Sequence, residues 1–225
     1  MSVVSDTIDW LTDSDHYSGT DGITHRLVEH LGYTAETIAI AAVIAIPIGL
    51  WIGHTGRFRS TAVAITGAFR ALPTLGLLTA IVLFMGIGLT PTLIALVVLA
   101  VPPLLAGAYS GLESVDRQTI DAARAMGMTE LQILRKVEIP LALPIIVGGA
   151  RSAVLQVVAT ATVAAYVGLG GLGRFLIDGQ AVSDYAQMAG GAVLVVVLAF
   201  LLDGAFAGLQ GLATGRRPQK LSSTA

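Results

Sequence analysis

The sequence predicts an all-α membrane protein with about five transmembrane helices. Its 225 residues are 54% hydrophobic and only 12% charged, with a mean hydropathy of +0.78, whereas soluble domains carry about 25% charged residues. Residues 71–112, 152–173 and 185–202 contain no charged side chain. A helix that crosses the bilayer needs about 20 mainly apolar residues, so each of these stretches is long enough to span it. A soluble domain of this size would have no way to bury so much apolar surface.

The predicted spans follow from these apolar runs. Residues 71–112 are too long for one span, and the Gly/Pro turn signal GIGLTP at 86–91 divides them into two. Residues 58–70 either extend the second helix beyond the lipid or lie along its surface. The five predicted spans are 34–53, 66–87, 91–112, 143–166 and 187–211.

The basic residues orient these spans, because cytoplasmic segments of membrane proteins carry an excess of Lys and Arg. Nine of the 13 basic residues fall in segments that share one side under a five-span count: Arg57, Arg59, Arg117, Arg124, Arg135, Lys136, Arg216, Arg217 and Lys220. The distribution predicts an N-terminus outside the cell and a cytoplasmic C-terminal tail at 214–225.

Residues 1–30 are predicted to form an extracytoplasmic N-terminal segment. The first 25 residues contain no Lys or Arg, which does not suit a secretory signal. Val4, Ile8 and Leu11 share one helical face, so residues 2–13 form either a short helix on the outer leaflet or a disordered tail. Residues 31–213 then constitute the membrane domain.

A polar block from Asp116 to Pro140 separates the third and fourth spans on the predicted cytoplasmic side. Asp116 is a suitable N-cap, and Gly127 is a suitable C′ residue for a first short helix. The stretch TELQ at 129–132 matches the capping box that begins a second helix. That helix should end near Val137, because Pro140 disfavours a helical residue before it. The residues alone fit either a docking surface for another protein or a solvated loop.

The stretch DAARAMGMTELQILRKVEIP at 121–140 resembles the EAA loop of the membrane subunits of ATP-binding-cassette (ABC) importers. The family pattern is Glu-Ala-Ala, three residues, Gly, nine residues and Ile-x-Leu-Pro, and this sequence keeps every spacing. Asp replaces Glu, Val replaces Ile and Ile replaces Leu, each with charge or character preserved. The matching positions, which the resemblance implies are coupling residues, are Asp121, Ala122, Ala123, Gly127, Val137, Ile139 and Pro140.

Other stretches are similar to one branch of these permeases, the one that takes up osmoprotectants such as glycine betaine, carnitine and choline. They include FRALPTLGLL (69–78), GIGLTPTLIAL (86–96) and YVGLGGLGRFLIDG (166–179). The resemblance covers about residues 30–212 and implies the MetI-like transmembrane fold of type I ABC importers. Methionine-type permeases share the EAA loop, so a permease for methionine or another amino acid is the alternative. An ATP-independent channel or secondary carrier is a third hypothesis.

The resemblance also implies partners. The EAA loop would dock on a separate cytoplasmic ATPase that binds ATP and Mg²⁺. A second permease, which is the same chain or a paralogue, would complete the pathway, and an extracytoplasmic binding protein would deliver the solute in a bacterial or archaeal inner membrane. No P-loop is present, because neither Lys136 nor Lys220 follows a glycine. We expect a non-catalytic transport subunit with no cofactor or metal, and the net charge of −2 gives no reason to expect nucleic acid.

Two pairs of polar residues within the fourth and fifth spans are candidate functional groups. Arg151 and Asp203 each lie about eight residues from the predicted cytoplasmic end of a span, so we hypothesise that they form an ion pair within the bundle. Thr160 and Thr162 either line the solute pathway or make hydrogen bonds between helices.

The Gly-rich stretch GLGGLG at 168–173 matches the dinucleotide fingerprint G-x-G-x-x-G in form. That fingerprint requires a preceding strand in a βαβ unit, and here the stretch ends a predicted span on the outer side. It is interpreted as an outer loop or gate that faces the binding protein, formed by Gly168, Gly170, Gly171 and Gly173.

Overall fold

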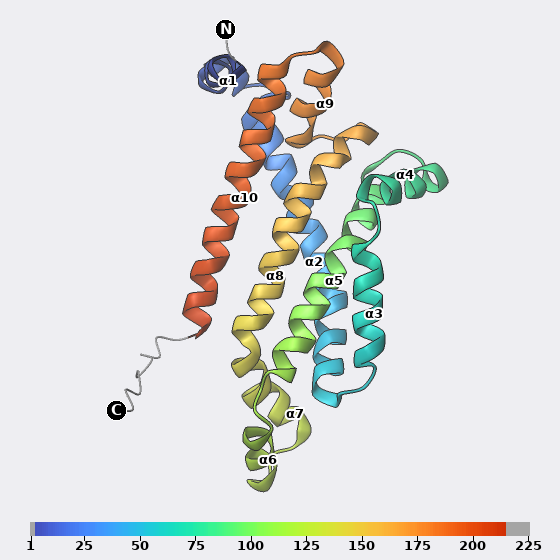
Figure 1. Ribbon diagram of the computed structural model, residues 1–225, viewed down its shortest axis with the longest axis vertical. Coiled ribbons are helices and arrows are strands. Elements are labelled where there is room, and N and C mark those ends of the chain that lie inside the picture. Colours follow the sequence, from blue (N-terminus) through green and yellow to red (C-terminus); the bar gives the residue numbers. More distant parts are fainter. Residues whose placement is uncertain (1–2, 215–225) are drawn as a thin grey trace.

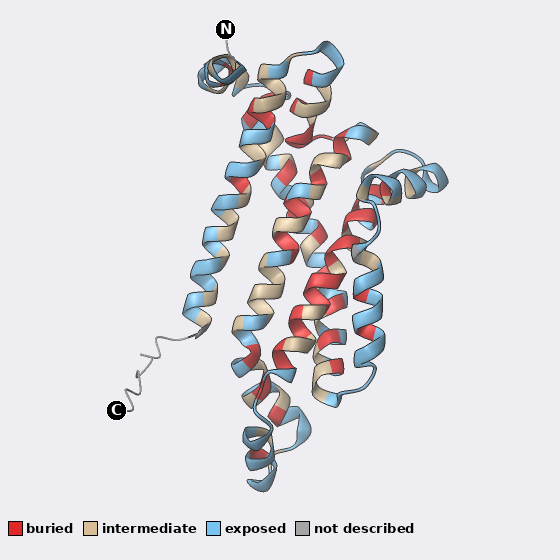
Figure 2. Cartoon of the chain, viewed as in Figure 1, coloured by how far each residue is buried: buried red, intermediate tan, exposed pale blue. Residues whose placement is uncertain are grey.

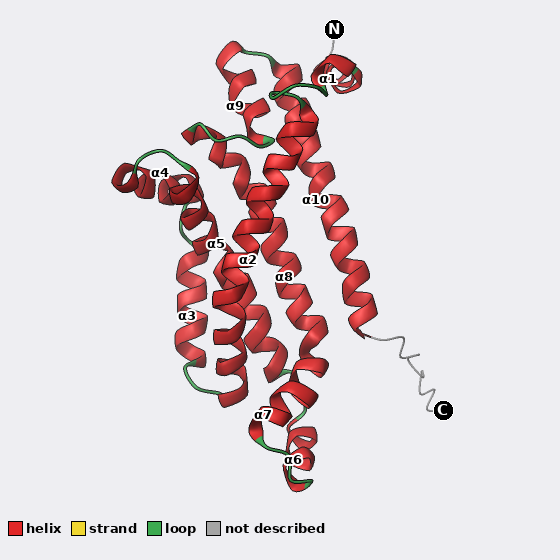
Figure 3. Cartoon of the chain, turned by 180° about the vertical axis from the view of Figure 1, so that it is seen from behind, coloured by secondary structure: helices red, strands yellow, loops and turns green. Residues whose placement is uncertain are grey.

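The computed structural model describes residues 3–214. Every regular element in that range is a helix, and none is a strand (Figure 3). Four helical segments are long and apolar enough to cross a membrane, and a bent pair of shorter helices is either a fifth, broken span or a re-entrant loop. The four are built on α2 (Ile23–Thr55), α5 (Leu89–Glu113), α8 (Ile139–Ala161) and α10 (Tyr185–Thr214). The predicted all-α membrane class is confirmed, and the tail residues 215–225 lie outside the described range.

Small residues allow α2, α5 and α8 to pack closely side by side (Figures 1 and 3). A Cβ atom added to Gly49 of α2 would lie 2.6 Å from the Cβ of Ala108 on α5. A Cβ atom on Gly107 of α5 would lie 2.6 Å from the Cα of Gly149 on α8. Backbones therefore touch at both crossings, as is common between membrane helices. Figure 2 shows that buried residues concentrate on α5, which packs against both α2 and α8.

The proline pair in the middle of α5 is accommodated by a side chain of α8. Pro103 has no backbone N–H to donate to the carbonyl of Leu99 one turn earlier. The side-chain amide of Gln156 donates to this carbonyl at 3.1 Å. Pro102 and Pro103 are themselves buried. A neighbouring helix thus satisfies the backbone group that the proline leaves free, as is required in a water-free environment.

The predicted second span, 66–87, is wrong as a single helix. Residues 59–70 form α3 (Arg59–Arg70), which packs against α5, and a second helix, α4 (Thr74–Met85), follows at an angle of 87°. Pro73 occupies the N-cap of α4 in an extended conformation, and a proline disfavours helical geometry in the residue before it. The break therefore lies inside the apolar run, and α4, with 12 residues, is too short to span alone.

The prediction that Pro140 ends the second helix of the polar block is also wrong. After α7 (Glu130–Ile133) the chain continues through a π-helical turn, η2 (Leu134–Glu138), directly into α8. The backbone N–H of Ile139 donates to the carbonyl of Leu134, five residues earlier. Pro140 follows in the first turn of α8, so it lies within a continuous helical segment and does not end it.

Short helices cover the two ends of the bundle (Figure 1). One end carries α6 (Arg117–Ala125) and α7. The opposite end carries α1 (Val3–Thr12), the 3₁₀ turn η1 (Ser14–His16), the 3₁₀ segment η3 (Thr162–Val167) that follows α8, and α9 (Gly173–Val182). Residues 3–12 thus form a short N-terminal helix rather than a disordered tail, and its position on the outer leaflet stays a prediction.

The N-terminal helix α1 has one face on the protein and one face free. The indole of Trp10 contacts Phe175 edge-on, with ring centroids 5.3 Å apart, and a Cβ atom on Gly190 would lie 2.3 Å from the indole. Val4 and Ile8 are exposed. The free apolar face is suited to a position against the outer leaflet.

Candidate functional site

The first helix of the polar block, α6, has the predicted caps. The carboxylate of Asp116 accepts a hydrogen bond from the backbone N–H of Gln118 at 3.0 Å. The helix ends at Ala125, and Gly127 follows with φ at +82°, a left-handed conformation that glycine adopts without strain. No atom lies within 4 Å of a Cβ atom added to Gly127. The glycine is thus needed for backbone conformation, and the space beside it is open.

The second helix begins at the predicted capping box. The hydroxyl of Thr129 accepts from the backbone N–H of Gln132 at 3.4 Å, and the side-chain carbonyl of Gln132 accepts from the backbone N–H of Thr129 at 2.9 Å. This reciprocal pair fixes the turn at Gly127 between the two helices. The two helices therefore form a knob at the end of the bundle (Figure 1).

The motif residues divide between the exposed surface and the chain's own interior. Asp121, Ala122, Gly127 and Pro140 are exposed. Ala123 is 2% exposed because it faces inward, and Val137 and Ile139 are partly buried. Ala123 therefore lies inside the chain rather than on the exposed surface of the knob, and the role of the motif positions in coupling stays a prediction.

Ion pairs join α6 to α7. The guanidinium of Arg124 donates to the Glu130 carboxylate at 2.8 Å and 3.0 Å, and to Asp121 at 3.2 Å. The hydrogen bond to Glu130 is the main reason that the pKa of Arg124 lies above its ordinary value. All three side chains are well exposed. The motif position Asp121 is therefore held in a charged cluster at the surface of the knob.

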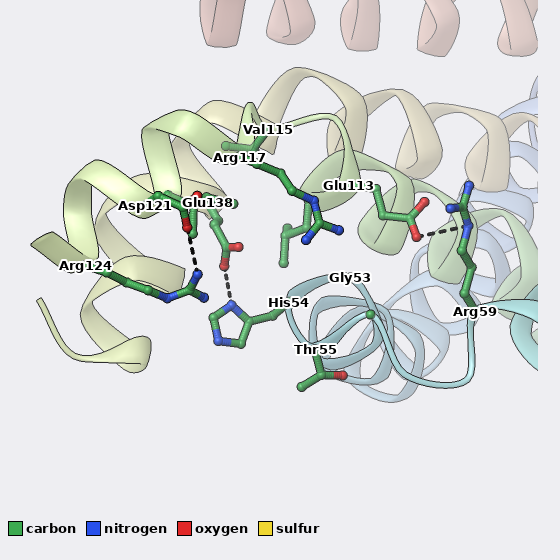
Figure 4. Close-up of a pocket in the computed structure, with 13 residues that line it drawn as sticks. Gly53, His54, Thr55, Arg59, Glu113, Val115, Arg117, Asp121, Arg124 and Glu138 are labelled. Atoms are coloured by element: carbon green, nitrogen blue, oxygen red, sulfur yellow. Dashed lines mark hydrogen bonds and ion pairs between the residues drawn. The ribbon is translucent and has the colours of Figure 1, made fainter.

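A polar cavity of about 310 Å³ lies where the knob meets the ends of α2 and α5 (Figure 4). Its charged lining includes Arg59 and Glu113, which pair at 3.1 Å. His54, in the last turn of α2, places Nδ1 2.5 Å from a carboxylate oxygen of Glu138 in η2. His54 and Glu138 were not predicted as a site, because 84 residues separate them and the EAA pattern leaves the Glu138 position unspecified.

The hypothesised intramembrane pair is present in the structure. Arg151 of α8 donates through Nε and one terminal nitrogen to the two carboxylate oxygens of Asp203 on α10, at 2.5 Å and 2.6 Å. This two-pronged geometry is the strongest arrangement of an Arg–carboxylate pair. Each side chain is about one-third exposed (32%) at the surface of the single chain. The pair links two long apolar helices, α8 and α10, in which a lone charge would be costly.

The threonines at the end of α8 bond to their own helix. Thr160 donates to the Gln156 carbonyl at 2.8 Å, and Thr162 donates to the Ala159 carbonyl at 2.7 Å. Each hydroxyl uses its O–H donor within its own helix. The hydroxyl oxygen could still accept a hydrogen bond from a solute if it lined a pathway. Hydrogen bonds from these donors to another helix are not formed.

The Gly-rich loop lies against the first turns of α2. The carboxylate of Glu29 accepts from the backbone N–H of Gly171 at 2.9 Å and from Arg26 at 2.8 Å. A Cβ atom on Gly170 would lie 2.0 Å from this carboxylate. Gly168 and Gly171 have positive φ angles of +77° and +86°. A helical segment rather than a strand precedes the loop, so the dinucleotide interpretation has no structural support.

Gly173 is enclosed by the backbone of Thr162, and replacing it should destabilise the protein. A Cβ atom there would lie 2.1 Å from the backbone carbonyl oxygen of Thr162, which cannot move aside as a side chain can. We expect Gly173→Ala to cost about 1–3 kcal/mol, as overpacking of a core does. The measurement is thermal denaturation of the purified protein in detergent. Gly32→Ala is the matched control, because open space surrounds Gly32 within α2, and its stability should not fall.

Comparison with known proteins places this geometry in a family. Residues 45–212 match the family model described as "Binding-protein-dependent transport system inner membrane component". The carnitine transport permease protein OpuCD of Listeria monocytogenes is 33% identical over 88% of this chain and 89% of its own length. The osmoprotectant import permease protein OsmW of Salmonella typhimurium is 32% identical over 93% of this chain and 97% of its own.

A solved structure shares the fold. A chain of the MetNI methionine ABC transporter, in an inward-facing conformation, superposes with a TM-score of 0.76 at 28% identity, over 85% of this chain and 95% of that one. The MetI-like fold that the EAA loop implied is therefore confirmed. The chain belongs to the family of inner membrane components of binding-protein-dependent transport systems, the membrane-spanning permease subunits of ABC transporters.

Proposed function

We propose that this permease forms the translocation pathway of an ABC importer for osmoprotectants such as glycine betaine, carnitine or choline. The observation that carries the proposal is similarity along nearly the whole chain to permeases named for carnitine and osmoprotectant transport. The residues that match the family model, 45–212, include membrane helices as well as the knob. The chain would be non-catalytic, and ATP and Mg²⁺ would be bound by the partner ATPase.

The assembly would contain two permeases, two ATPase subunits and an extracytoplasmic binding protein. The capped knob of α6 and α7 projects from one end of the bundle, where an ATPase can reach it (Figure 1). The basic residues of the segment 117–136 support a cytoplasmic position for this end, because cytoplasmic segments carry an excess of Lys and Arg. The Gly-rich loop and α1 would then face the binding protein and the outer leaflet.

A methionine permease is the alternative, and one observation favours it: the solved structure named above is a methionine transporter. Fold similarity alone does not assign a substrate. The relatives named for osmoprotectants are more similar in sequence, at 32–33% identity. The osmoprotectant assignment is therefore the better supported.

The test is transport by the reconstituted complex. The chain, its co-purified ATPase and the binding protein would be placed in lipid vesicles, and uptake of radiolabelled glycine betaine, carnitine and choline would be followed with Mg²⁺-ATP. We expect uptake of at least one of them to require ATP and the binding protein. Uptake of methionine alone would replace the substrate assignment. Solute movement by the chain alone, without ATP, would contradict the ABC mechanism.

A further inference from the structure

One histidine joins the end of α2 to both segments that follow the turn at Gly127. Nδ1 of His54 lies 2.5 Å from Glu138 in η2, and Nε2 lies 3.4 Å from a carboxylate oxygen of Glu130 in α7. The imidazole therefore sits between two carboxylates, one on each of its nitrogens (Figure 4 shows the contact with Glu138). This arrangement is not part of the EAA pattern.

Because the side chain of Glu138 is buried, its carboxylate requires a polar or charged partner. The side chain of Glu138 is 3% exposed and that of His54 is 15% exposed. A carboxylate removed from water is costly unless a hydrogen-bonding or oppositely charged partner compensates it. Among the described residues, His54 provides the side-chain partner of the Glu138 carboxylate. Loss of His54 would leave Glu138 without that compensation, so the two side chains constrain one another.

The pair also continues into the knob. Glu130 bonds to Arg124, and Arg124 bonds to Asp121 of the EAA motif. Leu50, one turn before His54 on α2, and Ile120 of α6 pack against the same buried apolar cluster. The end of α2 is therefore linked to the knob in two ways. One is the shared apolar cluster, and the other is the series of polar contacts that runs from His54 through Glu130 and Arg124.

The position of Glu138 in the π-helical turn strengthens the argument. Such turns are rare and occur often at functional sites, because they cost hydrogen-bond geometry and persist where a side chain must be placed. Glu138 is the last residue of that turn. The turn joins the knob to α8, and His54 ties the same point to α2.

We propose that His54 is a positioning residue for energy coupling: by bridging Glu138 and Glu130, it makes α2 move together with the knob and α8. The inference rests on the proposed ABC mechanism but not on the identity of the solute. A displacement of the knob by an ATPase would then reach two membrane helices, α8 through the continuous backbone and α2 through the imidazole. Without the bridge, α2 would follow only through apolar contacts, which permit sliding.

The experiment measures the ratio of solute imported to ATP hydrolysed in the reconstituted complex. His54→Ala and Glu138→Ala should each lower this ratio about tenfold, within the range found for residues that couple distant sites. The double variant should be no worse than either single one.

The matched control is His25→Ala, which removes an exposed histidine that also contacts a glutamate, Glu29, at 3.5 Å. Its ratio should equal that of the wild type. If the alanine variants do not assemble, His54→Gln with Glu138→Gln provides a neutral pair of similar shape that should assemble with a lowered ratio. A wild-type ratio in either set of variants overturns the inference.

Failure of the substrate assignment would be recognised separately. A wild-type complex that does not take up glycine betaine, carnitine or choline contradicts that assignment. ATP hydrolysis by the same complex, relative to the ATPase subunit alone, still reports on His54. Coupled hydrolysis that is unchanged by His54→Ala would overturn the role of the bridge whichever solute is transported.

Discussion

Gly127→Trp is expected to leave membrane insertion intact and to abolish ATP hydrolysis that depends on the binding protein. The left-handed conformation of Gly127 would cost a side chain about 1–2 kcal/mol, which is too little to prevent folding. Open space surrounds the position within this chain, so an indole would project from the knob and obstruct the groove of the ATPase. The measurement is ATPase activity of the reconstituted complex with and without loaded binding protein.

The control for this variant is Gly86→Trp. Gly86 also has a positive φ, of +85°, and nothing lies within 4 Å of its added Cβ atom. It follows α4, away from the knob (Figure 1). Its ψ angle of 173° makes this conformation at least as strained for a side chain as that of Gly127. The control therefore tests backbone strain at another location, and coupling should be retained. Normal coupling in Gly127→Trp would refute the assignment of this loop.

Asp203→Asn should sharply reduce the amount of stable complex and lower its melting temperature in detergent by several degrees. The substitution leaves the Arg151 guanidinium, which is partly buried between α8 and α10, without its carboxylate partner. Removing one partner of a partly buried pair costs more than removing both, since a lone charge remains. The measurements are yield after gel filtration and thermal denaturation in detergent.

Two variants show whether the effect belongs to the pair. Arg151→Gln combined with Asp203→Asn removes both charges and should recover much of the lost stability. Asp178→Asn breaks another Arg–Asp contact, that with Arg174 at 2.6 Å on α9, where Asp178 is nearly half exposed. Exposed pairs contribute little, so this control should behave as the wild type. Equal stability of Asp203→Asn and the wild type would exclude a structural role for the pair.

The sequence was sufficient where the signal is local. Uncharged runs predicted the long helices, and Asp116, Gly127 and Thr129 predicted the helix ends of the knob, because a cap requires only residues within one turn. The two errors in the fold both concern proline. Pro73 breaks a helix inside an apolar run, whereas Pro140 lies within a continuous helix. Residue type alone does not distinguish them, because the outcome depends on what satisfies the neighbouring backbone groups.

The candidate site was less predictable where it depends on contacts between distant segments. The pair of Arg151 and Asp203 was predictable because each is a rare charge in an apolar span. His54 and Glu138 gave no such signal, since each occurs among other polar residues at a helix end. The inward direction of Ala123 was likewise hidden, because an alanine on a helix fits an interior position and a docking face equally well.

The π-helical turn at residues 134–138 makes the number of residues in this segment as important as their identity. Deleting one residue there would restore an ordinary α-helix and rotate everything on its N-terminal side by about 100° relative to α8. Asp121 and Gly127 would then face a different direction although every side chain of the motif was still present. Insertions and deletions should therefore be tolerated in the loops of this protein and not in these five positions, which act as a spacer that sets the angle of the knob.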